Sequence, residues 1–144
     1  MEFASLVREV YIAASPEVVF EVVSRPEHIR HWWPDEAAYD VRPGASGEIR
    51  FGDPAAGGAV QSLTVVEVRP PESFTFRWTG HDLLVNLALA PSGEGTLLTL
   101  TETGFREVGW ERAVLEQAYR EHEQGWDHFL PRLAPYVASV GARR

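Results

Sequence analysis

The sequence predicts an α+β fold in which a curved antiparallel sheet wraps around a long C-terminal helix, with two short helices after the first strand. Three observations predict this fold. The stretch Trp110–Val140 has the apolar period of an amphipathic helix. A long region of strand-like alternation precedes that stretch, and two helix-start signals follow the first alternating segment. We expect a single domain over residues 1–144, because this length matches one ordinary domain.

The composition is that of a globular protein, with 44% hydrophobic and 24% charged residues. No apolar run approaches the ~20 residues that a membrane helix requires. The segment Met1–Ser15 also lacks the long apolar stretch of a signal peptide. We therefore predict a cytoplasmic protein that has no membrane partner.

The charge and the missing residue types exclude several classes of function. A net charge of −8 with singly scattered Arg residues argues against nucleic acid and anionic membranes as partners. Cysteine is absent, which excludes disulfides, thiol nucleophiles and cysteine zinc sites. All 13 basic residues are Arg, so a Schiff-base lysine and a P-loop lysine are excluded as well. We predict no cofactor.

The first part of the chain indicates one strand and two helices. Leu6–Ile12 alternates weakly, as a strand does. In Ser15–Glu17 the serine can cap a helix, the proline suits its first turn and the glutamate complements its dipole. Pro26 and Glu27 begin a second short helix, which Pro34 ends.

The middle of the chain predicts a meander of hairpins, because short turns separate its strand-like segments. These segments are Tyr39–Val41, Glu48–Phe51, Ala59–Arg69, Ser73–Thr79, Leu83–Ala90 and Thr96–Thr103. The helix is expected to cover one face of the sheet, and Phe74, Phe76 and Trp78 share a face. Which face of Leu83–Ala90 points inward stays open.

The C-terminal helix has one apolar stripe at 3.6-residue spacing, formed by Leu115, Tyr119, His122, Trp126, Phe129, Leu130 and Leu133. Pro131 and Pro135 each remove a backbone donor, which predicts a kink or break near residues 127–131. The acidic residues of the helix are interpreted as a solvated face; they are Glu116, Glu121, Glu123 and Asp127.

The order of elements, together with several short motifs, resembles a known superfamily. The motifs are Ala14–Phe20, Pro26–Ile29, Trp32–Trp33, Arg42–Gly44, Val66–Glu72 with Phe74–Trp78, Gly95–Leu100 and Gly125–Trp126. Over residues 6–137 they resemble the START-like or SRPBCC superfamily with its helix-grip fold, as in the birch-pollen allergen. The chain is most similar to the Aha-type family, named for the activator of heat-shock-protein ATPase. This resemblance implies an apolar cavity between sheet and helix, which some members use for hydrophobic ligands and others for catalysis.

The candidate ligand-binding residues are mainly aromatic, because a broad apolar wall suits such a cavity. They are Trp32, Trp33, Phe51, Phe76, Trp78, His122, Trp126 and Phe129. His122 is expected to point inward, where it could orient a polar ligand group or transfer a proton. The simpler interpretation is a core histidine that bonds to Tyr119 or to a strand side chain.

Other polar residues have simpler interpretations. His28 and His31 have a spacing that suits two metal ligands, but no third ligand is suggested nearby, so we predict no metal site. Arg77 is interpreted as a solvated charge. Asn86 would join His122 as a polar contact in the cavity if the register of its strand turned it inward.

Three hypotheses of function follow. The leading one is a protein that holds a hydrophobic or aromatic small molecule between the sheet and the C-terminal helix. The second is a cyclase-, aromatase- or hydrolase-like enzyme with His122 as acid or base and Tyr119 assisting. The third is a cochaperone-like interaction module of the stress response, which the Aha-type resemblance implies. It ranks last, and a chaperone partner is not expected, because the chain lacks the additional N-terminal domain of full-length activators. A homodimer is left open.

Overall fold

The computed structural model of the protein describes residues 5–52, 58–78, 83–105 and 112–142. Its elements are β1 (Ser5–Ile12), α1 (Pro16–Ser24), α2 (Pro26–Ile29), β2 (Glu36–Ala38), β3 (Ser46–Phe51), β4 (Ala59–Arg69), β5 (Ser73–Trp78), β6 (Leu83–Ser92), β7 (Gly95–Thr103), α3 (Arg112–Phe129), the 3₁₀ turn η2 (Leu130–Arg132) and α4 (Leu133–Ala142). The predicted positions Thr79 and Trp110 lie outside the described residues.

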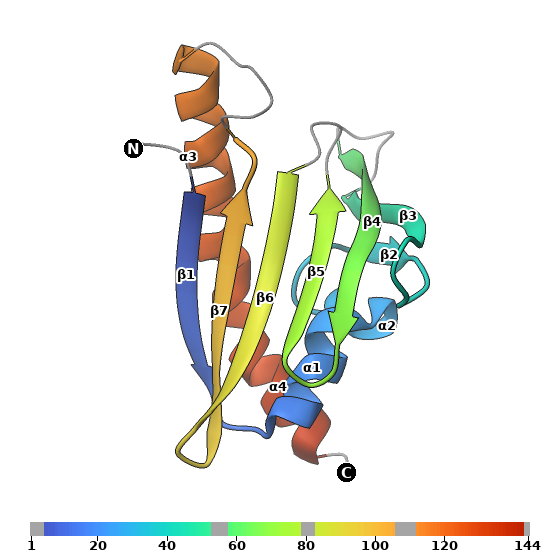
Figure 1. The fold of residues 1–144 in the computed structure, drawn as a ribbon, viewed down its shortest axis with the longest axis vertical. Coiled ribbons are helices and arrows are strands. Elements are labelled where there is room, and N and C mark those ends of the chain that lie inside the picture. Colours follow the sequence, from blue (N-terminus) through green and yellow to red (C-terminus); the bar gives the residue numbers. More distant parts are fainter. Residues whose placement is uncertain (1–4, 53–57, 79–82, 106–111, 143–144) are drawn as a thin grey trace.

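The strands form one seven-stranded antiparallel sheet in the order β1-β7-β6-β5-β4-β3-β2. The first strand of the chain therefore pairs with the last, from Ser5 opposite Thr103 to Ile12 opposite Thr96. Figure 1 shows the helices gathered behind this sheet, with α3 running along β1 and β7. The predicted α+β helix-grip fold is confirmed.

The two short helices begin as the sequence predicts. The Ser15 hydroxyl accepts a hydrogen bond from the main-chain N–H of Val18 at 3.3 Å, which caps α1. The prolines Pro16 and Pro26 stand in the first turns of α1 and α2. The chain after α2 then places Trp32 and Trp33 inside the protein, where both are buried.

The strand predicted at Tyr39–Val41 forms earlier, as β2 at Glu36–Ala38. Tyr39 directly follows this strand, and its hydroxyl donates to the main-chain oxygen of Ser24 at 2.6 Å. β2 lies so close to β3 at Gly47 that a Cβ there would collide with the Ala38 carbonyl oxygen. Only glycine fits at that position of β3.

The turn predicted at Pro91–Gly95 is shorter than expected. β6 continues through Pro91 to Ser92, and Pro91 lies opposite Thr96 of β7. The turn itself needs only Gly93 and Glu94, and Gly93 has a φ of 57°. A glycine adopts that conformation without steric cost, which allows the tight connection.

The C-terminal helix breaks where its prolines predict. α3 ends at Phe129, η2 contains Pro131, and α4 then continues to Ala142. On the predicted stripe, Trp126, Leu130 and Leu133 are buried, and the other members are half-buried. The stripe therefore faces the sheet, as expected.

The core lies between the helices and the inner face of the sheet. The register of β6 buries Leu83, Val85, Leu87 and Leu89, so these odd-numbered residues point inward. Asn86 lies on the outer face and donates to the Thr75 hydroxyl at 2.7 Å. Asn86 therefore does not join His122. Within the described part of the chain, no helix has the length and apolar character needed to cross a membrane.

Candidate ligand-binding pocket

A pocket of about 260 Å³ lies between α3 and the strands β3, β4 and β5. Six of the predicted ligand-binding residues line it; they are Trp33, Phe51, Trp78, His122, Trp126 and Phe129. Four further residues complete the wall, namely Ala59, Gln61, Glu121 and Gly125. The fold thus brings together side chains from the segment after α2, from the sheet and from α3.

Two predicted site residues, Trp32 and Phe76, lie in the core and not along this pocket. Trp32 is 1% exposed, and its indole N–H donates to the main-chain oxygen of Val22 at 3.1 Å. Phe76 is 2% exposed and packs against Trp33, with 5.5 Å between ring centroids. The sequence does not separate these two residues from the pocket residues, because a cavity wall and a core have the same composition.

Trp33 joins the aromatic walls of the pocket. Its ring centroid lies 5.0 Å from those of Trp78 and Trp126 and 5.9 Å from that of Phe51. Phe51 in turn contacts Phe129 at 5.7 Å. Aromatic pairs at these separations are attractive and hold one another in place. The walls are therefore apolar and well packed.

Gly125 leaves space in the pocket. It stands inside α3, and a Cβ added there would meet no atom within 4 Å. A glycine inside a helix costs stability relative to alanine. The open side of this glycine faces the aromatic walls described above.

Glu102 is the residue that the sequence reasoning missed. It stands on β7 between Leu6 of β1 and Val85 of β6, and it is fully buried. Burial of a carboxylate is costly unless hydrogen bonds replace its water. A sequence signal existed, because Glu102 continues the period of two formed by the buried Leu98 and Leu100.

Three ring nitrogens surround the Glu102 carboxylate. The indole N–H of Trp78 donates to Oε2 at 2.6 Å, and that of Trp126 donates to Oε1 at 2.9 Å. Nδ1 of His122 lies 3.0 Å from Oε1 and 3.1 Å from Oε2. An indole only donates, so the carboxylate must accept from both tryptophans. This arrangement explains how a charged residue is accommodated inside the core.

His122 both contacts a strand side chain and lines the pocket. Its Nδ1 bonds to a strand side chain, and its ring also lines the pocket with 18% of the side chain exposed. The ring packs against Trp78 at 5.2 Å and Phe105 at 5.4 Å, which fixes its plane. The partner of Nδ1 is Glu102 and not Tyr119, whose hydroxyl donates to the main-chain oxygen of Ser5 at 3.1 Å.

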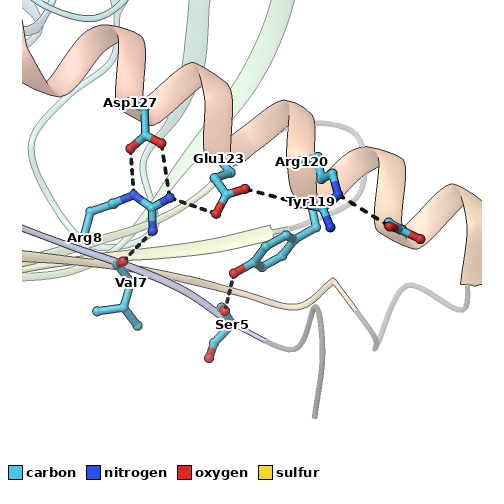
Figure 2. A network of polar contacts seen from close by, with 8 residues as sticks. Ser5, Val7, Arg8, Tyr119, Arg120, Glu123 and Asp127 are labelled. Atoms are coloured by element: carbon cyan, nitrogen blue, oxygen red, sulfur yellow. Dashed lines mark hydrogen bonds and ion pairs between the residues drawn. The ribbon is translucent and has the colours of Figure 1, made fainter.

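A network of ion pairs holds α3 against β1 (Figure 2). Arg8 of β1 donates from Nε to Asp127 Oδ1 at 2.7 Å and from Nη2 to Glu123 Oε2 at 2.9 Å. The Arg8 guanidinium lowers the pKa of Asp127 through this hydrogen bond. Asp127 is exposed, as the interpretation of a solvated face predicts, and Glu123 is half-buried. Both also pair with Arg8, which stands on the inner face of its edge strand.

His28 and His31 both contact Tyr136 of α4. Nδ1 of His28 lies 2.7 Å from the Tyr136 hydroxyl, and the His31 ring stacks on Tyr136 at 5.0 Å. Over the ranges the structure describes, no three His, Asp or Glu side chains converge as metal ligands do. Arg77 is exposed on β5.

A larger open groove of about 710 Å³ runs beside α1 and α2. Its lining includes four carboxylates, those of Glu17, Glu21, Glu27 and Asp40. It also contains Tyr39, whose burial raises the pKa of its hydroxyl. This groove lacks the packed aromatic walls and the histidine, so the smaller pocket is the stronger candidate for a ligand site.

Solved structures show the same fold. Protein MLL2253 from Mesorhizobium loti is 22% identical, with a TM-score of 0.79 over 94% of this chain and 97% of that chain. DynU16, a putative protein in the dynemicin biosynthetic locus, is 26% identical, with a TM-score of 0.76 over 95% of this chain and 48% of that chain. The present chain thus spans about half of DynU16. The Aha1 dimer from Colwellia psychrerythraea is 16% identical, with a TM-score of 0.72 over 92% of this chain and 95% of that chain.

A search of curated proteins finds no match. The family model described as Activator of Hsp90 ATPase homolog 1-like protein matches residues 13–138, which is most of the chain. The match includes both short helices, the sheet from β2 to β7, and all of the residues that line the pocket. The chain therefore belongs to the family of Activator of Hsp90 ATPase homolog 1-like proteins.

Proposed function

We propose that the protein binds a small aromatic or hydrophobic molecule in the pocket between α3 and the sheet. The observation that supports this best is the combination of packed aromatic walls with a few polar side chains, those of Gln61, Glu121 and His122. Binding sites for small molecules typically combine an apolar lining with a few polar groups that orient the ligand. Membership in a family with a helix-grip fold is consistent with such a site.

The size of the pocket limits the ligand. Its volume of about 260 Å³ is just below the range of ~300–1,000 Å³ that is usual for drug-sized ligands. A substituted single ring fits this volume, whereas a sterol does not. Burial of ~150–200 Å² of ring surface gains about 4–5 kcal/mol at ~25 cal/mol per Å². Because association costs offset part of this gain, we expect dissociation constants of about 1 mM for unoptimised rings.

The test uses 4-methylanisole, a single ring without a hydrogen-bond donor. Three tryptophans line the pocket, so titration should change the tryptophan fluorescence and raise the melting temperature. The variant Gly125→Leu places a side chain in the pocket and should abolish both responses while the protein stays folded. If the variant responds as the wild type does, the ligand binds elsewhere and the proposal is wrong. No response from the wild type at a few millimolar would reject it as well.

A second candidate function is acid–base catalysis in the same pocket. The specific observation is the contact between Glu102 and Nδ1 of His122, because a carboxylate that orients an imidazole is a recurring arrangement in catalytic sites. In this function, His122 acts on a pocket-bound substrate and Glu102 positions the imidazole. The hydroxyl of Tyr119 donates to the main-chain oxygen of Ser5. This contact does not support the predicted role of Tyr119 in assisting His122.

Hydrolysis of 4-ethylphenyl acetate tests this second function. Water cleaves the ester to 4-ethylphenol and acetate, and both the ester and the phenol contain the single ring that suits the pocket. A catalytic His122 predicts that His122→Ala lowers the rate by about 10²-fold or more while 4-methylanisole still binds. An unchanged rate in the variant would dismiss catalysis and leave the binding function intact.

A homodimer stays a prediction for this chain. The Colwellia psychrerythraea protein is described as an Aha1 dimer, and that similarity supports testing the oligomeric state by light scattering.

A further inference from the structure

The hydrogen bonds around Glu102 determine where His122 holds its proton. Each oxygen of the carboxylate accepts from an indole N–H, and Nδ1 of His122 lies 3.0 and 3.1 Å from the same two oxygens. A carboxylate only accepts hydrogen bonds, so Nδ1 of His122 is the donor in this contact. In the neutral imidazole, Nε2 is then the nitrogen without a hydrogen.

Nε2 of His122 belongs to one of the polar side chains that line the pocket, beside those of Gln61 and Glu121. Over residues 5–52, 58–78, 83–105 and 112–142, the hydrogen bonds of His122 all go through Nδ1. Within the same ranges, no buried side-chain nitrogen or oxygen lacks a partner. Nε2, which has no partner among these residues, is therefore not fully buried. Its lone pair is an acceptor for a ligand that donates a hydrogen bond.

The charges around the pocket favour a neutral ligand. Glu121 lines the pocket, and the buried Glu102 lies directly behind His122. The described lining contains no Arg. An anionic ligand would approach two carboxylates without a permanent cation to oppose them, and this repulsion disfavours carboxylic acids.

We propose that the pocket selects a neutral single-ring phenol, whose hydroxyl donates a hydrogen bond to Nε2 of His122 while its ring packs against Trp33, Trp78 and Trp126. Phenols keep their proton at pH 7, as the tyrosine side chain does. This inference rests on the proposed binding function. It adds the chemical class of the ligand, which the aromatic walls alone leave open.

The experiment compares three probes that share a ring of the same size. 4-Ethylphenol and 4-methylanisole are isomers, but only the phenol can donate a hydrogen bond. 4-Ethylbenzoate adds a negative charge at the same end. Calorimetry or titration followed by NMR gives the three dissociation constants. We expect 4-ethylphenol to bind about tenfold more tightly than 4-methylanisole, and 4-ethylbenzoate to bind more weakly than both.

The variant His122→Asn separates the role of Nε2 from the role of Nδ1. The amide nitrogen of asparagine takes the place of Nδ1 and can still donate to Glu102, but no atom replaces Nε2. The ratio of the two dissociation constants should fall from about ten to about one in this variant, because only the phenol loses a hydrogen bond. His128→Asn is the matched control, because His128 is exposed on the same helix and does not line the pocket. It should keep the preference.

The outcomes distinguish this inference from the function on which it rests. The inference is overturned if 4-methylanisole binds the wild type as tightly as 4-ethylphenol, or if His122→Asn keeps the preference for the phenol. In either case Nε2 does not select a hydrogen-bond donor, but the proposed binding function remains supported. Tightest binding of 4-ethylbenzoate would overturn the argument from charge. If none of the probes binds, the binding function and the inference are both rejected.

Discussion

The carboxylate of Glu102 is fully buried, yet both of its oxygens accept hydrogen bonds from side chains that are otherwise apolar or aromatic. Trp78, His122 and Trp126 thereby have two roles each, since their rings line the pocket and their N–H groups bind the carboxylate. Such a network holds the rings in one orientation. At the scale of single residues, Glu102 thus joins three side chains of the pocket wall through hydrogen bonds.

Glu102→Gln should therefore destabilise the protein although it preserves shape. A glutamine has one oxygen and one NH₂ group, so either orientation of its amide places a donor against the indole N–H of Trp78 or Trp126. An unsatisfied buried donor costs about 1–3 kcal/mol. We expect the free energy of unfolding, measured with urea, to fall by that amount.

Glu9→Gln is the control for this substitution. Glu9 is exposed on β1, so the same chemical change should alter the free energy of unfolding by less than about 0.5 kcal/mol. Equal effects of the two substitutions would contradict the role given to Glu102.

At the scale of elements, α3 is positioned by contacts on two sides. Its apolar stripe packs on the sheet, and Arg8 of β1 binds Asp127 and Glu123 (Figure 2). β1 is an edge strand that pairs only with β7 among the described strands. The ion pairs therefore join the last helix to the first strand of the chain and support the helix that forms one wall of the pocket.

The contact between Arg8 and Asp127 predicts a dependence of stability on pH. The pKa of Asp127 is lowered in the folded protein, mainly by its hydrogen bond with Arg8. The ion pair therefore stabilises the fold at pH values above the ordinary aspartate pKa of 3.8, and this contribution is lost as the pH falls through the lower folded value. Because Asp127 is about half exposed, we expect only about 0.5–1 kcal/mol.

Unfolding by urea at several pH values measures this contribution. Asp127→Asn should be less stable than the wild type at pH 7, and the difference should shrink as the pH falls below the aspartate value. Asp40→Asn is a suitable control, since the ion pair of Asp40 with Arg42 is exposed and 3.7 Å long. A difference that stays constant with pH would show that Asp127 acts through something other than its charge.

At the scale of the whole molecule, the sheet and the helices enclose a continuous core that opens at the pocket. The opening depends in part on Gly125, because a side chain at this position of α3 would enter the empty space. Glycine inside a helix also gives the unfolded chain extra conformational freedom. The protein thus retains a residue that lowers stability and leaves room for a ligand.

Gly125→Ala should stabilise the protein by about 0.5–1 kcal/mol, because its Cβ meets no atom within 4 Å and the helix gains a better residue. The change is measured as a rise in melting temperature. Gly93→Ala provides the contrast, since Gly93 has a φ of 57° in the β6–β7 turn and an alanine there is strained. That variant should be less stable than the wild type. If Gly125→Ala melts at a lower temperature, the space beside Gly125 is not open.

The sequence by itself determined the elements and several local details. A period of two or of 3.6 shows which residues share a face. Ser15 predicts where a helix begins, and Pro131 predicts where one breaks. All of these effects act within a few residues along the chain. The apolar stripe with His122 was visible for the same reason. Six of the eight predicted ligand-binding residues line one pocket. Whether they bind a ligand stays a prediction.

Only the tertiary structure decided which faces meet. Trp78 and Trp126 each lie 24 positions from Glu102 in the chain, and His122 lies 20 positions away, yet all three reach one carboxylate. The pairing of β7 with β1 and β6 turns Glu102 inward, and the register of β6 turns Asn86 outward. Local periodicity contains no information about contacts between distant elements, since these depend on how the whole core packs. The partner of His122 was therefore decided by the fold.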